Sequence, residues 1–240
     1  MTGRLDGRSG ATPAGARAID AIVFDLDSTV ADTFGLLLAA FDTATRSIRG
    51  QPLTRDEMVA HFGTGAGTEE AILCALAKRE QLPGDVLDRF YRAYADGHNA
   101  LVQLFPRIRK TLEVARARGL VLGMVTSKGP RSAEITLREL GIAGFFGVVA
   151  TGDDTPAPKP DPRGLLGVLA RLGVAPARAL FVGDTVADVG AGRGAGTLIA
   201  LACWNDPGDP ALAGLRPDFV LHTGDDLRVL LDRLAPAPAT

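Results

Sequence analysis

The most constraining feature of the sequence is a short apolar segment that ends abruptly in acidic residues, within positions 18–32 (AIDAIVFDLDSTVAD). Residues 21–24 are apolar, and Asp25, Asp27 and Asp32 follow closely. A short apolar run without polar alternation is typical of a strand that is buried on both faces of a parallel sheet. We therefore predict a buried strand that delivers carboxylates to its C-terminal end.

Asp25 and Asp27 are candidate site residues because open parallel sheets bind ligands beyond the carboxyl ends of their strands. Two carboxylates two positions apart repel each other unless a cation neutralises them, and Mg²⁺ prefers oxygen ligands. The alternative is that both acids only cap the following helix. This stretch alone leaves both interpretations open.

The rest of the chain alternates apolar strands with helices, which predicts an α/β fold built on a doubly wound parallel sheet. Further strands are expected at 120–125, 145–150, 179–182, 197–201 and 219–222, and helices at 106–118, 130–140, 164–172, 186–193 and 225–234. After a helix expected at 34–48, the pattern stays helical to about residue 103, with no convincing strand. A helical block inside such an alternation indicates an inserted domain.

We therefore predict four parts in the chain. A Rossmann-like core comprises 18–34 and 104–235, an all-helical insertion comprises 35–103, and flexible tails comprise 1–17 and 236–240. The first tail lacks the apolar segment of a secretory signal, and the second is a Pro/Ala extension with nothing to bury.

Charge and cysteine content bear on partners and compartment. The formal net charge of -2 gives no reason to expect nucleic acid or an anionic membrane surface. No apolar run approaches the length of a membrane span. Cys74 and Cys203 match no metal-ligand spacing, so we expect buried free thiols, a reducing compartment and a cytoplasmic protein, either monomer or homodimer.

Four strand ends carry polar residues whose chemistry fits together. They are Asp25 with Asp27, Thr126 with Ser127, Lys159, and Asp184 with Asp188. If the sheet is parallel, all four groups open onto one crevice. The acids suit Mg²⁺, whereas a lysine and a hydroxyl-bearing turn suit a phosphoryl group.

In order and spacing, these residues resemble the four motifs of the haloacid dehalogenase (HAD) superfamily. The motifs are Asp25-Leu-Asp-Ser-Thr29, Thr126, Lys159 in a KPDP context, and Gly183-Asp184-Thr-Val-Ala-Asp188. The helical block resembles the C1-type cap of that superfamily. The segments TSKGP, DTPAPKPDP and ALFVGDTVADVGAGRGAG are most similar to its phosphoglycolate phosphatase subgroup. The resemblance covers residues 20 to about 235.

The resemblance implies a Mg²⁺-dependent phosphatase that hydrolyses a small phosphate monoester, such as phosphoglycolate, through an aspartyl-phosphate intermediate. Asp25 would be the nucleophile, and Asp27 would act as general acid and then as general base. Thr126 and Ser127 would bind the phosphoryl oxygens, and Lys159 would stabilise their charge. The alternatives are that Thr126 is a plain turn residue and that Lys159 is a solvated loop charge.

The implied Mg²⁺ ligands are Asp25, the backbone carbonyl of Asp27, Asp184 and Asp188. As an alternative, Asp188 could be an acid in the first turn of a helix, where it favours the helix dipole without any ligand. One departure is Ser28, because many family members have glycine there. The turn after Asp27 must therefore accept a side chain.

The substrate-selecting element is expected in the cap, which we predict to be a mobile lid. Its glycine-rich turn at 61–67 includes Gly63, Thr64 and Gly65, whose backbone amides could approach an anion. The alternative is a mere flexible connection between helices. His61, Lys78 and Arg79 are all possible partners for a substrate carboxylate.

Related activities remain as alternatives. The resemblance implies that dehalogenases need no acid at the position of Asp27, and that sugar phosphomutases often have valine where this chain has Thr29. Both residues therefore favour a phosphatase. A pyrophosphatase with the same cap, or a non-catalytic scaffold of this fold, stays open, although no motif side chain is missing.

Overall fold

The apolar segment before Asp25 forms a central strand of a six-stranded parallel sheet. In the computed structural model, which describes residues 18–61, 68–205, 212 and 214–235, the strand order is β5-β4-β1-β6-β7-β8. Every pairing in this sheet is parallel. The strands are β1 (Ala21–Phe24), β4 (Val121–Val125), β5 (Val148–Ala150), β6 (Ala179–Gly183), β7 (Leu198–Ala202) and β8 (Phe219–Leu221).

The register aligns the carboxyl ends of three strands. Phe24 of β1 lies opposite Met124 of β4 on one side and Val182 of β6 on the other. The chain runs outward from β1 through β4 to β5, and it then returns to β6 and runs outward the other way. Open α/β sheets form their ligand crevice at such a reversal, so the topology places a site beyond β1, β4 and β6.

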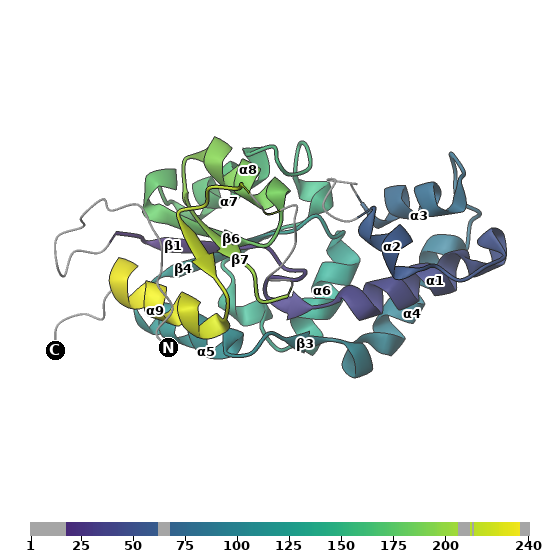
Figure 1. Cartoon of the computed structure of the whole chain (residues 1–240), viewed down its shortest axis with the longest axis horizontal. Helices are drawn as coiled ribbons and strands as arrows, with labels where there is room; N and C mark the ends of the chain where they lie inside the picture. Colours follow the sequence, from purple (N-terminus) through teal and green to yellow (C-terminus); the bar gives the residue numbers. More distant parts are fainter. Residues whose placement is uncertain (1–17, 62–67, 206–211, 213, 236–240) are drawn as a thin grey trace.

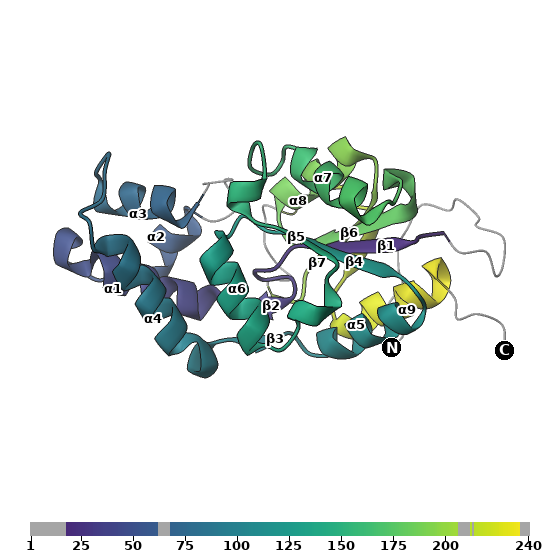
Figure 2. The same cartoon turned by 180° about the vertical axis from the view of Figure 1, so that it is seen from behind.

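Helices cover both faces of the sheet, which explains why β1 is apolar without alternation. Ile22 and Phe24 pack in one cluster with Leu112 of α5, whereas Val23 packs in another with Leu165 of α7. Figures 1 and 2 show α7 and α8 on one side of the sheet and α5 and α9 on the other. The helices are α5 (Ile108–Ala117), α6 (Pro130–Glu139), α7 (Arg163–Leu172), α8 (Val186–Ala195) and α9 (Gly224–Leu234).

The helical insertion, which we call the cap, lies at one end of the molecule (Figure 1) and packs around a separate hydrophobic cluster, to which the core helix α6 contributes Ile135. Phe41, Met58, Phe90 and Tyr94 are fully buried in it. The α2 helix begins with a capping box between Thr54 and Glu57, which satisfies its first backbone amides. The cap helices are α1 (Phe34–Arg49), α2 (Arg55–Val59), α3 (Glu69–Ala77) and α4 (Val86–Leu101).

Two short strands that the sequence did not predict join the core to the cap. They are β2 (Ala31–Asp32) and β3 (Gln103–Leu104), which pair antiparallel. Strands of two residues are too short to show an alternating pattern. The pair lies beside both expected junctions, and the division into a core (18–34, 104–235) and a cap (35–103) remains a proposal. The expected tails, 1–17 and 236–240, lie outside the described residues.

Element ends differ by a few residues from the predictions. The strand expected at 145–150 begins only at Val148, because Ala143–Phe145 form a 3₁₀ turn, η1. The helix expected at 106–118 begins at Ile108, because Arg107 before it has a φ of 71°. Two further 3₁₀ turns are η2 (Gly152–Asp154) and η3 (Pro176–Arg178). Fold class and strand order are those expected of a doubly wound sheet with a helical insertion.

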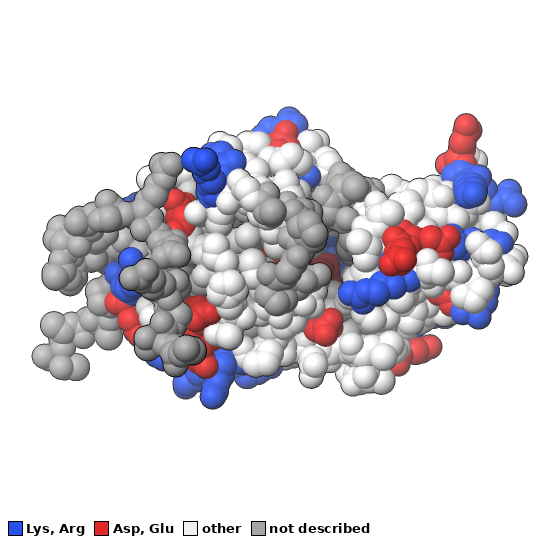
Figure 3. All heavy atoms as spheres, viewed as in Figure 1, with Lys and Arg blue, Asp and Glu red and all other residues white. Residues whose placement is uncertain are grey.

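Surface and cysteines add three observations. Figure 3 shows charges of both signs interspersed over the described part of one face, with no continuous basic surface. Cys203 is buried and Cys74 is half-buried, and neither forms a disulfide in the described part of the chain. None of the helices in the described part of the chain is long and apolar enough to cross a membrane.

Candidate active site

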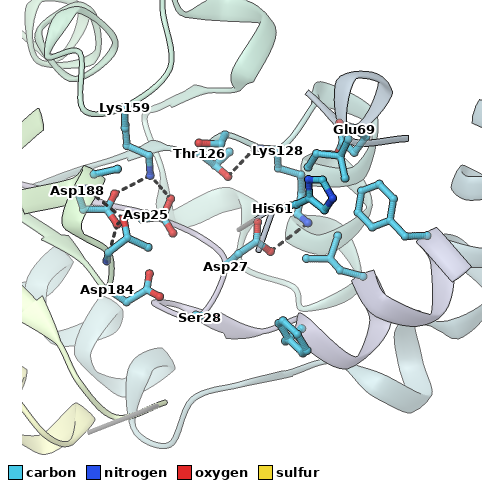
Figure 4. A pocket seen from close by; sticks show the side chains of 17 residues that line it. Asp25, Asp27, Ser28, His61, Glu69, Thr126, Lys128, Lys159, Asp184 and Asp188 are labelled. Carbon is cyan, nitrogen blue, oxygen red and sulfur yellow. Dashed lines mark hydrogen bonds and ion pairs between the residues drawn. The ribbon is translucent and has the colours of Figure 1, made fainter. Parts of the chain in front are cut away.

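The turn after β1 presents Asp25 and Asp27 in different directions (Figure 4). Ser28 adopts a φ of 61°, and its backbone N–H donates to the carbonyl of Ala31, which closes the turn. This left-handed conformation favours glycine, so Ser28 fits at some cost in strain. The turn lets the Asp25 carboxylate face Lys159 while the Asp27 carboxylate faces Lys128.

Lys159 lies between two buried carboxylates. Its ammonium donates to Asp25 Oδ1 at 2.5 Å and to Asp188 Oδ1 at 2.6 Å. Burial alone would lower the pKa of Lys159, but the carboxylates of Asp188 and Asp25 outweigh it and raise that pKa. Lys159 is therefore a fixed positive charge in the site rather than a solvated loop residue.

Asp188 serves both the helix and the site. Its Oδ2 accepts hydrogen bonds from the backbone N–H of Thr185 at 3.0 Å and from Thr185 Oγ1 at 2.6 Å, in a capping box at the start of α8. Its Oδ1 faces Lys159. Gly183 makes this approach possible, because a Cβ there would lie 2.4 Å from Asp188 Cγ.

Three carboxylates form a cluster that fits a divalent cation. Asp25, Asp184 and Asp188 each offer an oxygen, and these oxygens lie within 4.8 Å of one another. Burial raises the pKa of Asp25 to about 7, although Lys159 opposes the shift. Burial and the charges of Asp188 and Asp25 raise the pKa of Asp184 well above its usual range. Such crowding of acids is what a bound cation would relieve.

Thr126 and Ser127 lie at the end of β4, on the same pocket. The Thr126 side chain is buried, and its Oγ1 accepts a hydrogen bond from the backbone N–H of Lys128 at 3.1 Å. Thr126 does act as a turn residue, as the alternative proposed. Because its hydroxyl accepts this hydrogen bond, the O–H group can still donate one to a ligand.

On the cap side, Lys128 is buried against Asp27. Its Nζ lies 3.0 Å from Asp27 Oδ1 and 4.8 Å from the centre of the Tyr94 ring on α4. The same Asp27 oxygen accepts a hydrogen bond from Thr33 Oγ1. The general-acid candidate is thus held on the side of the pocket that faces the cap.

Glu69, the first residue of α3, joins the cap to the core. Its carboxylate is buried and accepts a hydrogen bond from the backbone N–H of Gly129 at 2.8 Å and another from Ser132 Oγ. These groups belong to the first turn of α6 and the residue before it. The carboxylate therefore satisfies backbone and hydroxyl donors at the start of a core helix, where negative charge is favourable.

Residues 22–202 match the haloacid dehalogenase-like hydrolase family. This chain belongs to that family. It is 35% identical over 227 residues to a phosphoglycolate phosphatase of Pseudomonas putida, covering 91% of this chain and 80% of the relative. It is also 33% identical over 220 residues to the pyrophosphatase PpaX of Bacillus velezensis, covering 88% of this chain and 95% of the relative.

A solved structure also resembles this HAD-like hydrolase. CbbY from Rhodobacter sphaeroides, in complex with phosphate, superposes with a TM-score of 0.74 at 25% identity, covering 87% of this chain and 96% of that one. The family and the phosphatase relatives confirm that the chain is an enzyme of the HAD phosphatase type. The relatives include two different phosphatase activities.

In this HAD-like hydrolase, one pocket gathers all the core residues that the sequence proposed. They are Asp25, Asp27, Thr126, Ser127, Lys159, Asp184 and Asp188. The proposed cap residues Gly63, Thr64 and Gly65 lie outside the described residues, so their role stays a prediction. His61 does line the pocket.

Sequence reasoning missed Lys128 and Glu69, both of which line the pocket of this HAD-like hydrolase. Lys128 carried a signal, because the chain has only four lysines and two of them follow predicted strands. Glu69 carried none, since an acid at the start of a helix is commonly exposed. Their places depend on how the cap packs on the core, which no local pattern encodes.

Proposed function

We propose that this HAD-like hydrolase is a Mg²⁺-dependent phosphatase that cleaves a small, phosphoglycolate-like phosphate monoester through a phosphoryl group carried on Asp25. The observation that carries the proposal is the arrangement around β1. Asp25 faces a cation cluster site and a buried lysine, while Asp27, two residues later, faces the opposite side of the same pocket. Two carboxylates in different surroundings suit two chemical roles.

In the first step, a carboxylate oxygen of Asp25 attacks phosphorus and the ester P–O bond breaks. Asp27 gives its proton to the leaving oxygen, which departs as the alcohol. In the second step, Asp27 removes a proton from water, whose oxygen attacks phosphorus. The bond to Asp25 breaks, and inorganic phosphate and the free carboxylate result.

Lys159 and Thr126 bind and orient the phosphoryl group in both steps. The ammonium of Lys159 offsets the charge of the approaching phosphate and of Asp25, which lie within its reach. The Thr126 hydroxyl supplies a hydrogen-bond donor at the end of β4. We propose the Ser127 turn as a further contact to phosphoryl oxygens.

Asp25, Asp184 and Asp188, with the backbone carbonyl of Asp27, are the residues that would hold Mg²⁺. The three carboxylates supply the hard oxygen ligands that this ion prefers. The ion, when bound, neutralises charge on the phosphoryl oxygens as Lewis acid. The free thiols of Cys74 and Cys203 suit a reducing compartment, and we propose the cytoplasm.

Pyrophosphate is the second candidate substrate, because one of the compared relatives is a pyrophosphatase and another a phosphoglycolate phosphatase. The core residues proposed from the sequence contact the phosphoryl group, the metal and the leaving oxygen in this scheme, and these are common to both substrates.

Asp25→Asn is expected to keep the fold and to lose essentially all turnover of p-nitrophenyl phosphate, because an amide cannot form the acyl phosphate. Turnover is measured with Mg²⁺ and after its removal with EDTA. Asp184→Asn is the comparison, and its activity should return in part at high Mg²⁺. Wild-type activity in Asp25→Asn with no activity in Asp184→Asn would instead favour a metal-activated water as nucleophile.

A further inference from the structure

The ammonium of Lys128 is a buried positive charge in the wall of the pocket. Its side chain is only 2% exposed, and it lies on the cap side of Asp27 (Figure 4). Lysine is rarely buried without partners that satisfy its charge. The position of Lys128 in the loop after β4 does not by itself explain why this lysine is buried.

The hydrogen-bonding capacity of this ammonium is not used. The Nζ carries three N–H donors, yet it makes no hydrogen bond of acceptable geometry to the described residues. Its contacts are the charge of Asp27 at 3.0 Å and the face of the Tyr94 ring. An acceptor that enters the pocket would find donors available there.

Both neighbouring carboxylates have hydrogen-bond donors other than Lys128. Glu69 is satisfied by the backbone N–H of Gly129 and by Ser132 Oγ, and Asp27 accepts from Thr33 Oγ1. The ammonium of Lys128 lies 3.0 Å from the Asp27 carboxylate, and this buried ion pair favours its charged form.

The contact with Asp27 shows where Lys128 lies relative to the leaving group of the substrate. The phosphoryl group is assigned to Asp25 and Lys159, and Asp27 must touch the oxygen of the leaving group. Lys128 lies beyond Asp27, on the side away from Lys159 (Figure 4). It therefore borders the space that the leaving group occupies.

We propose, on the basis of the proposed function, that Lys128 binds a second anionic group carried by the leaving group and so selects phosphate compounds that have such a group. A carboxylate or a second phosphate could supply that anion, one short link from the phosphoryl group. Phe34, Leu37 and Ile72 line the same pocket with apolar surface, so Lys128 is the buried cation on the cap side of Asp27 that a second anion could reach.

The test compares two substrates that differ only at the far end of the leaving group. They are 2-phosphoglycolate and 2-hydroxyethyl phosphate, in which a neutral hydroxymethyl group replaces the carboxylate. Their kcat/KM values are measured with Mg²⁺ in wild type and in Lys128→Met and Lys128→Gln. Loss of Lys128 also disturbs Asp27, but this acts on both substrates and cancels in the ratio of the two values.

We expect the kcat/KM of wild type to be higher for phosphoglycolate than for 2-hydroxyethyl phosphate by about tenfold or more. In both variants the ratio should fall near one, because the hydrogen-bonded charge pair between Lys128 and the carboxylate is lost only for phosphoglycolate. The control is Lys110→Met on α5, whose side chain is 66% exposed and pairs with Glu113. It should leave the ratio unchanged. Thermal melting of each variant establishes that it folds.

Pyrophosphate is measured alongside, with p-nitrophenyl phosphate, whose leaving group carries no second anionic group, as its comparator. A selective loss for phosphoglycolate identifies a carboxylate as the second anion, and a selective loss for pyrophosphate identifies a phosphate. Equal losses for substrates with and without a second anionic group would overturn the proposal and reduce Lys128 to a positioning residue for Asp27. Wild-type ratios near one for both pairs of substrates overturn it without any variant. If wild type hydrolyses none of these compounds, the proposed phosphatase function itself fails.

Discussion

At the scale of single residues, the site holds more negative charge than its protein partners neutralise. Asp25, Asp184 and Asp188 lie within one cluster, and Lys159 is the cation that contacts two of them. The pKa of Asp25 is raised to about 7, chiefly because of burial. A raised acid pKa means that the folded state holds its proton up to higher pH than the unfolded chain does.

This sign predicts how the metal-free protein responds to pH. The stability contributed by protonated Asp25 is fully present below its ordinary pKa of 3.8 and is lost as pH rises through about 7. In EDTA, the melting temperature of wild type should therefore fall by a few degrees between about pH 5.5 and 7.5, relative to that of Asp25→Asn. With Mg²⁺ present, the melting temperatures of wild type and Asp25→Asn should change with pH in the same way. Parallel curves in EDTA would contradict the charge crowding described here.

At the scale of elements, the loop after β4 and the start of α6 serve the core and the cap together. Thr126 belongs to the phosphoryl side of the pocket, Lys128 contacts Asp27 and Tyr94, and Gly129 donates to Glu69. Movement of α3 or α4 relative to the core would therefore alter the surroundings of the general acid. This gives the predicted mobile cap a specific route of influence on the chemistry.

Glu69→Gln tests the contact between α3 and α6. The neutral amide weakens the hydrogen bonds to Gly129 and Ser132 and removes a charge from the start of α6, at a cost of about 1.5–3 kcal/mol. We expect faster hydrogen exchange at the Gly129 amide and kcat/KM lower by roughly tenfold. Glu70→Gln is the matched control, because Glu70 is the next residue on α3 and is exposed. Identical exchange and activity in the two variants would contradict the role of Glu69.

At the scale of the whole molecule, much of the fold follows from local pattern. The buried strand β1, the strand–helix alternation and the acids at the strand ends are encoded by short segments, so the sheet and its site edge could be predicted. The β2–β3 pair could not, since two residues carry no periodicity. Lys128 and Glu69 were not predicted for a different reason. They are buried where the cap packs on the core, through contacts between residues that are distant in the sequence.

The central claim is that the phosphoryl group passes through Asp25, and a burst experiment with Asp27→Asn tests it most directly. Without the general base, hydrolysis of the intermediate should become slow, whereas an aryl leaving group needs little protonation to depart. Rapid mixing with p-nitrophenyl phosphate should release about one p-nitrophenolate per active site before slow turnover. Borohydride reduction followed by mass spectrometry should then find position 25 converted to homoserine. Steady turnover with no burst and an unmodified Asp25 would contradict the account.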